Sequence, residues 1–534
     1  MISLRDRILP PYTRRVDDLR HRLVKSIAVF ALLLTAIFMG FWIAVFGTLV
    51  AQPFFVLVGV LFILAFWLVD DTEPDYRKTL AKMLITYGVL ESAWPSYLAL
   101  DIPGLPWITP PRLVLLAMML LMTLQIAQSS RVRGEVSEAI AYNKMAFLIL
   151  GLFWLVAFAT IAFSRYPGTS AVVLVQNFVL WNAPFLVAIW VFGDRDVFAR
   201  FVKAMMWTMC FIFLLTTLEY IQRKPIWFDY IPSFLKIDGP LFAALMEEQV
   251  RVGDDRYRAR GVFAVHLYFA QFMLMVTPFI LHKAIENKGW MRFWAWALLV
   301  FNLVVIWMTN TRTGMSGFIL ICSGMIGLYA LRRFLNPTSK SDMVAPGIFM
   351  SAPVGMLAFG VLIALSPRLQ TMTVGGAQTR GSDQGRDVQW QKGMAALESN
   401  PFGHGADVSA RIAGRLVGDR YIIDSLWLNL LLDFGVLGFV AFIGFILTAA
   451  YFGVRMYLRA TDERVKLMGP AAVAVGGMAM TTYTISYWSN LPFMFILCAS
   501  IFAFRRSVLQ EERGLNAPPK SAIPLRSPLL GRTA

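Results

Sequence analysis

Residues Gly435–Tyr457 read GVLGFVAFIGFILTAAYFGVRMY, with Arg455 as the only charged side chain. An α-helix crosses the roughly 30 Å hydrocarbon core of a bilayer in about 20 residues, so this stretch is long enough to span it. Similar runs recur along the 534-residue chain, which is 57% hydrophobic and only 15% charged. A soluble domain carries roughly a quarter of its residues as charged side chains. The composition therefore excludes a soluble protein and predicts a polytopic membrane protein.

The apolar runs predict α-helices rather than a barrel. They are apolar on all faces, whereas a closed β-barrel needs alternating segments of about ten residues. We expect an all-α fold with about 12–14 transmembrane helices, the lower number applying if the short hairpins near residues 51–53 and 488–490 do not form. The candidate spans are Ile27–Thr48, Phe54–Val69, Thr79–Ala99, Arg112–Gln128, Met145–Phe163, Ser170–Gly193, Phe201–Tyr220, Gly261–His282, Trp290–Thr309, Gly314–Leu331, Ile348–Ser366, Gly435–Tyr457, Leu467–Ser486 and Leu491–Phe504.

The basic residues orient these spans. The chain has a formal net charge of +16, but most of its 49 basic residues fall before the first span or in alternate short loops. Lys and Arg concentrate in the cytoplasmic loops of inner-membrane proteins. Both termini are therefore expected in the cytoplasm, and the positive charge is interpreted as a topology signal rather than a nucleic-acid-binding surface.

Two long loops, at 221–260 and 367–424, fall on the opposite, periplasmic side. The expected organisation is a basic cytoplasmic N-terminus (1–26), an N-terminal transmembrane bundle (27–220), a periplasmic loop (221–260), core transmembrane helices (261–366), a large periplasmic loop (367–424), C-terminal transmembrane helices (425–505) and a flexible cytoplasmic tail (506–534). The three cysteines lie in apolar runs and the four histidines are scattered. We therefore expect no disulfide framework, no metal and no cofactor.

Two arginine motifs lie where the chain meets the membrane on the periplasmic side. Arg260 begins the sequence RGVF, two residues after Arg258, at the start of a span. Arg312 lies in NTRTG (310–314), a very short connection between two spans. One interpretation is that these arginines mark an interface to which their side chains snorkel. The positive-inside rule predicts no arginine here, however, which favours a functional role.

The large periplasmic loop contributes further candidates. Arg386 and Trp390, in GRDVQW, lead into an expected short helix at Val388–Glu398, with Asp387 as its N-cap. The helix is expected to end before NPFGHG (400–405), which contains His404, either a base or an ordinary turn residue.

The return into the membrane adds a carboxylate and an indole. Asp424 and Trp427 lie in DSLWLN (424–429), followed by DFGVLG (433–438). Asp424 is a candidate catalytic base, with capping of a helix that begins at Ser425 as the alternative. Trp427, like Trp390, either anchors the interface or stacks on a sugar.

Arginines and a carboxylate at membrane height indicate a particular chemistry. Arginine suits bidentate phosphate binding, and a lipid-linked pyrophosphate presents its anionic group at this depth. In glycosyl transfer from such a donor, arginines would stabilise the charge of the leaving pyrophosphate, and a carboxylate would accept the proton of the acceptor. The reaction needs no metal if arginines take that role.

These motifs together resemble the bacterial O-antigen ligase/polymerase family over roughly Arg260–Gly438. The markers are Arg-Gly-x-Phe, Thr-Arg-x-Gly, Arg-x-x-x-Trp followed by Asn-Pro-x-Gly-x-Gly, and Asp-Ser-x-x-Leu with Gly-x-x-Gly. The resemblance implies a GT-C-like glycosyltransferase that uses undecaprenyl-pyrophosphate-linked glycans, with Arg260 and Arg312 as pyrophosphate-binding residues. Asp424 falls where ligases have His followed by Asn, whereas polymerase-like members often have Asp.

The leading hypothesis is therefore an exopolysaccharide or O-antigen polymerase in the bacterial inner membrane, with a periplasmic active site. Its catalytic residues would be Asp424, Arg312 and Arg260, and its substrate-binding residues Arg386, Arg258, Trp390, His404 and Trp427. A ligase acting on lipid A core, a lipid-linked oligosaccharide flippase and a peptidoglycan-type glycosyltransferase are the alternatives. Its partners would be the lipid-linked glycan, membrane lipids, and chain-length regulator or export proteins, with no nucleic acid.

Overall fold

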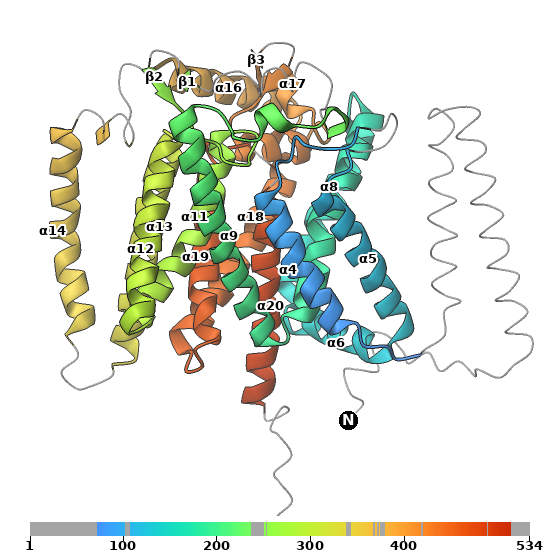
Figure 1. The fold of residues 1–534 in the computed structure, drawn as a ribbon. Coiled ribbons are helices and arrows are strands. Elements are labelled where there is room, and N and C mark those ends of the chain that lie inside the picture. The colour runs from blue at the N-terminus through green and yellow to red at the C-terminus, as the bar shows by residue number, and fades with distance from the viewer. Residues whose placement is uncertain are drawn as a thin grey trace, which may run out of the picture.

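The computed structural model describes residues 72–101, 107–235, 250–251, 254–337, 343–366, 369–370, 373, 380–417, 420–486, 488 and 490–513. They form a bundle of helices with two short antiparallel strand pairs at one end (Figure 1). Ten helices of this part are long and apolar enough to cross a membrane. They are α5 (Pro110–Gln128), α7 (Lys144–Ala159) continued by η1 (Thr160–Phe163), α8 (Pro167–Val191), α9 (Arg195–Gln222), α11 (His266–Glu286), α12 (Gly289–Met308), α13 (Arg312–Leu335), α14 (Val344–Leu365), α18 (Leu426–Arg459) and α20 (Leu491–Glu512).

The remaining elements are shorter or more polar. In chain order they are α4 (Arg77–Ala93), α6 (Ser130–Tyr142), η2 (Phe228–Tyr230), η3 (Ser233–Leu235), β1 (Val250–Arg251), β2 (Asp254–Tyr257), α16 (Arg380–Ser399), α17 (Ser409–Ala413), β3 (Arg415–Val417), β4 (Arg420–Ile422), η5 (Val465–Leu467) and α19 (Met468–Thr481). β1 pairs with β2, and β3 with β4.

The predicted spans Ile27–Thr48 and Phe54–Val69 lie outside the described residues. Ten of the other predicted spans coincide with these ten helices, so the protein is a polytopic all-α membrane protein. The predicted spans Thr79–Ala99 and Leu467–Ser486 fall on α4 and α19, which are not among the helices long and apolar enough to cross a membrane. The span expected from Gly261 begins only at His266 (α11), because a turn with Gly261 at φ +54° precedes it. α20 reaches Glu512, past the boundary expected at residue 505.

α11 and α20 form the interior of the bundle, and 78% of the residues in the apolar window of α20 are buried. In the apolar window of α11, 83% of the residues are buried, against 28% in α12 beside it. Polar side chains inside the bundle pair with each other: Asn302 donates to Thr277 (2.7 Å), and Asn490 donates to Gln271 (2.9 Å). Such bonds hold helices together where lipid supplies no hydrophobic driving force between them.

The bundle has two chemically different ends. α16, α17 and β1–β4 cover one end, which we call the loop face, and described parts of both long loops lie there (Figure 1). α6 and the C-terminal ends of α13, α18 and α20 lie at the other end, the opposite face. α6 is a polar helix that the sequence analysis did not predict.

Candidate functional site

The site begins with the junction between α12 and α13. α12 ends at Met308, Asn310 adopts a left-handed conformation (φ +47°), and α13 starts at Arg312. The hydroxyls of Thr309 and Thr311 lie 2.9 Å apart within the turn, and a Cβ on Gly314 would come 2.4 Å from the Thr311 hydroxyl. Arg312 is therefore fixed at the first position of a long helix, as the short connection predicted.

The guanidinium of Arg312 reaches across to α16. Its Nη1 and Nη2 donate to the two carboxylate oxygens of Asp383, at 3.0 Å and 2.6 Å. Arg386, one turn further along α16, approaches the same carboxylate with Nη1 at 3.5 Å. Its Nε is buried and has no hydrogen-bond partner among the described residues. Two guanidinium groups thus share one carboxylate, which leaves a net positive charge.

A groove opens beside this cluster. It has a volume of about 410 Å³ and runs between α13 and α19. Hydroxyl groups and apolar side chains both line it, so it joins the polar loop face to the lipid-facing side of the bundle. Its lining residues are Arg312, Thr313, Ser316, Gly317, Leu320, Thr373, Arg386, Met480, Thr481 and Thr484.

Asp424 is tied to the same helix, α16, by Gln389. The amide oxygen of Gln389 accepts from the Asp424 backbone N–H (3.0 Å), and its Nε2 approaches the Asp424 carboxylate (3.5 Å). Arg415 Nε lies 3.9 Å from that carboxylate. The N-cap of α18 is Ser425, whose hydroxyl accepts from Leu428 N–H (3.3 Å). The interpretation of Asp424 as the cap is therefore wrong, and its half-buried carboxylate remains available.

α16 differs from the helix that the sequence predicted. It runs from Arg380 to Ser399 instead of Val388–Glu398, so Asp387 lies inside it and is not its N-cap. Asp383 and Arg386 lie on one face because they are three residues apart, and Trp390 follows four residues later. The single helix α16 thereby holds the residues that contact Arg312 and Asp424.

The two tryptophans meet through a third aromatic residue. Trp390 stacks on Tyr483 at 5.6 Å between ring centres, and Trp427 meets Tyr483 edge to face at 5.6 Å. Trp427 Nε1 donates to Ala479 O (3.0 Å), so the polar edge of the indole is satisfied inside the bundle. The connection after α19 is also joined to α13, because the hydroxyls of Thr484 and Thr313 lie 2.9 Å apart.

His404 lies in a loop that packs against a break in α18. Gly435 has φ +70°, and the carbonyls freed at this break accept from the loop: His404 N–H donates to Leu432 O (2.8 Å) and Gly405 N–H to Asp433 O (3.0 Å). Broken membrane helices persist where other groups satisfy the freed backbone. Burial lowers the pKa of His404, whose ring bonds to the backbone of Ala396. These contacts favour the turn interpretation of His404.

A buried carboxylate anchors the same loop. Asp433 accepts backbone N–H groups of Asp407 (3.0 Å), Val408 (3.2 Å) and Ser409 (2.8 Å). These donors precede and begin α17, so Asp433 fixes the loop onto the broken helix.

Arg260 lies in a second cluster, built on α9. Glu219 accepts from Tyr257 OH (2.7 Å) and from the backbone N–H groups of Arg260 (3.1 Å) and Gly261 (2.8 Å). The Arg260 side chain is almost fully buried and lies over the ring of Phe228 (5.1 Å). Glu219 thus holds the RGVF segment in place.

The Arg260 segment joins the α12–α13 junction through the backbone. Ala259 N–H donates to Met308 O at 3.1 Å, four residues before Arg312. Arg258 Nη1 lies 3.1 Å from His266 Nε2 at the start of α11. Both arginine segments therefore border the same corner of the loop face.

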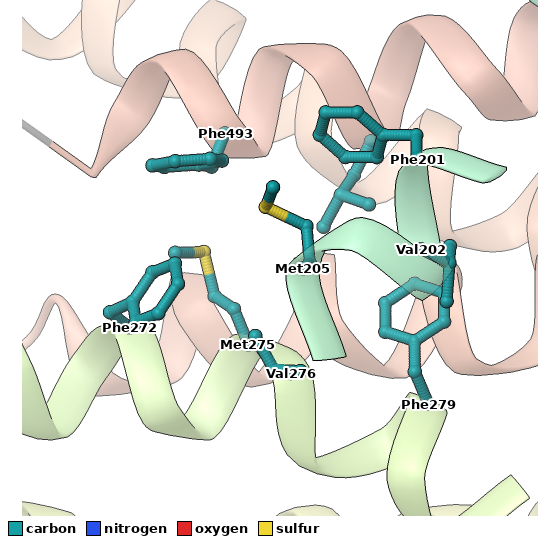
Figure 2. Close-up of a pocket in the computed structure, with 9 residues that line it drawn as sticks. Phe201, Val202, Met205, Phe272, Met275, Val276, Phe279 and Phe493 are labelled. Carbon is teal, nitrogen blue, oxygen red and sulfur yellow. The ribbon is translucent and has the colours of Figure 1, made fainter. Parts of the chain in front are cut away.

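An apolar pocket in the bundle is unrelated to this chemistry. It has a volume of only about 30 Å³ and lies between α9, α11 and α20, lined by side chains such as Phe201, Met205, Phe272 and Phe493 (Figure 2). Its size and lining are those of a packing gap. Among the described residues, no group of three His, Cys, Asp or Glu side chains could hold a metal ion.

Sequence reasoning missed Asp383, Gln389 and Tyr483. Asp383 and Gln389 flank Arg386 at spacings of three residues, a helical signal that was hidden because α16 was expected to begin at Val388. Tyr483 carries no local signal, since its importance comes only from the approach of α16 and α18.

Residues 297–443 match the family model described as O-antigen ligase. In this segment the chain is similar to the O-antigen ligase family. The segment runs from α12 to just past the α18 break, so it contains Arg312, Arg386 and Asp424, whereas Arg258 and Arg260 lie before it. Family members are glycosyltransferase-like enzymes, and the family together with the apolar helices points to the bacterial inner membrane. No curated protein matches the chain.

Proposed function

We propose that this protein is a polymerase, a membrane glycosyltransferase that extends glycans linked to undecaprenyl pyrophosphate. The observation that carries the proposal is the position of α16, which contacts both an arginine cluster beside a lipid-facing groove and the carboxylate of Asp424. The distribution of basic residues orients the loop face towards the periplasm. The chain would then work on lipid-linked repeats after they have crossed the membrane.

In this mechanism the arginines receive the leaving group. An acceptor hydroxyl oxygen forms a bond to the anomeric carbon of the donor glycan, and the bond from that carbon to the pyrophosphate oxygen breaks. The electron pair leaves with the pyrophosphate, whose growing negative charge Arg312 and Arg386 stabilise. The hydroxyl proton passes to the carboxylate of Asp424. Arg260 and Arg258 contribute positive charge at the neighbouring corner, and Trp390 provides an aromatic face near the acceptor.

A ligase is the second candidate, because the matching family model is described as O-antigen ligase. The two activities use the same donor chemistry and differ in the acceptor, which is a new lipid-linked repeat for a polymerase and a lipid or protein for a ligase. Asp424 in place of a His-Asn pair favours polymerisation. The family match also favours glycan transfer over the flippase alternative.

Purified protein in liposomes with undecaprenyl-pyrophosphate-linked repeats tests the proposal. Wild type should give a ladder of products, and Asp424→Asn should reduce the rate by roughly 10²–10⁴-fold, as expected for loss of a general base. Asp387→Asn makes the same chemical change on an exposed position of α16 and should leave the ladder intact. A ladder unchanged by Asp424→Asn would remove Asp424 as the base. No ladder from wild type with its own repeat would favour the ligase.

A further inference from the structure

The contact between Arg312 and Asp383 uses the donors that a phosphate group would need. Arg312 gives its two terminal nitrogens to the two oxygens of one carboxylate, at 3.0 Å and 2.6 Å. A guanidinium presents the same fork to carboxylate and phosphate oxygens. The phosphate-binding edge of Arg312 is therefore already occupied by a side chain of this protein.

The ion pair contributes little to folding where it lies. The Asp383 side chain is 46% exposed and that of Arg312 is 19% exposed. Ion pairs that reach solvent in this way add little stability, because water already solvates the carboxylate well. A carboxylate with a purely structural role is expected to be buried, as Asp433 is at the α18 break.

Arg312 and Asp383 separate most readily when an incoming anion takes the place of Asp383. Arg312 is the first residue of α13, where the positive end of the helix dipole disfavours a positive side chain. A neighbouring anion is therefore favourable for Arg312. Asp383 lies in the first turn of α16, where the dipole favours a negative side chain, and Arg386 remains beside it. Asp383 is therefore able to release Arg312, provided that an incoming anion replaces it.

We propose that Asp383 is a built-in phosphate surrogate, which holds the Arg312 fork in the donor-free protein and competes with the donor's pyrophosphate for it. This inference rests on the proposed function, because it assigns the Arg312 groove to pyrophosphate. Binding of the donor exchanges one anion for another on Arg312, so the guanidinium keeps its geometry throughout. The cost of displacing Asp383 weakens donor binding and eases release of the pyrophosphate product.

The proposal predicts an unusual gain in affinity. Removing a competing internal anion raises the apparent affinity by the inverse of the fraction of molecules in which the site is free. If Asp383 occupies Arg312 in about 90% of molecules, Asp383→Asn should bind pyrophosphate about tenfold more tightly. Asp383→Glu keeps a carboxylate at this position and should stay close to wild type. A residue that merely positions Arg312 would give the opposite sign, a loss of affinity in Asp383→Asn.

The experiment measures binding of inorganic pyrophosphate to the full-length protein in nanodiscs by calorimetry. The variants are Asp383→Asn, Asp383→Glu, Arg312→Gln and the control Asp387→Asn. Weaker binding by Arg312→Gln with tighter binding by Asp383→Asn supports the surrogate. Weaker or unchanged binding by Asp383→Asn overturns the surrogate but leaves the pyrophosphate site in place. Equal binding by wild type and Arg312→Gln, or none by any folded variant, overturns the surrogate together with the proposed pyrophosphate site.

Discussion

The arginines of the two faces differ in what lies around them. On the opposite face, Arg195 contacts both Asp462 and Glu511 at 2.8 Å. Arg332 contacts Glu286 at 3.2 Å and donates to the carbonyl of Ala460 at 3.0 Å.

The arginine cluster of the loop face lies beside an open groove. Arg312 and Arg386 share the one carboxylate of Asp383. The arginines of the opposite face join helix ends, so their acceptors come from several elements. Arg312 and Arg386 lie beside a groove instead, where two guanidinium groups on one carboxylate favour an incoming anion. The same residue type therefore joins helices at one end of the bundle, and under the proposed function it binds an anion at the other.

The largest expected effect concerns the arginine fork on the loop face. Arg312→Lys keeps the positive charge but replaces the planar fork with a point charge, and the two are not equivalent at a bidentate site. We expect the polymerisation rate to fall by about 10²–10³-fold, the scale seen when one stabilising donor is removed from a transition state. Thermal stability should change little. Polymerisation rates in liposomes and thermal melting of the purified protein measure the two effects. An Arg312→Lys variant with the wild-type rate would contradict bidentate binding by the Arg312 guanidinium.

The second prediction concerns the joint between the loop face and the bundle. Gly435 has φ +70°, and a Cβ there would come 2.4 Å from Pro401 O, so Gly435→Ala should destabilise the protein by about 2–5 kcal/mol. Gly444→Ala, further along α18, meets only Ile149 at 3.7 Å and should be neutral or stabilising by about 0.5–1 kcal/mol. Thermal unfolding in detergent compares the two variants. Equal stabilities would mean that the break is not a fixed feature.

Sequence patterns predicted the helices well and the site only in part. Long apolar runs and charge alternation are local signals, so the predicted spans from Thr79 onwards fall on helices, of which only α4 and α19 are not long and apolar enough to cross a membrane. Arg312 was predicted as a site residue because a basic residue in a short periplasmic connection breaks the positive-inside rule. The role of Asp383 was not predictable, because it depends on how α16 lies across the start of α13. The α18 break was hidden for the same reason, since a loop from outside the helix satisfies it.

The third prediction tests the structural role of arginines on the opposite face. Arg332→Gln removes the contact with Glu286, whose side chain is only 20% exposed. We expect a loss of roughly 1–2 kcal/mol in the free energy of unfolding, moderated because Lys466 also contacts Glu286 at 3.4 Å. The rate per folded molecule should stay unchanged. A large loss of rate at unchanged stability would contradict the division between the two faces.

The smallest expected effect is the pH dependence of the loop that closes the helix break. Burial lowers the pKa of His404 from its ordinary value of 6.5, so the unfolded chain binds a proton more readily than the folded protein. Stability contributed by neutral His404 is therefore present above pH 6.5 and is lost as the pH falls below that value. His404→Asn removes this titration, so its melting temperature should fall less steeply with acid than that of wild type. Parallel curves for the two proteins would mean that the His404 ring is solvated in the folded state. The loop would then be held to α18 by its backbone hydrogen bonds and by Asp433, without a buried imidazole.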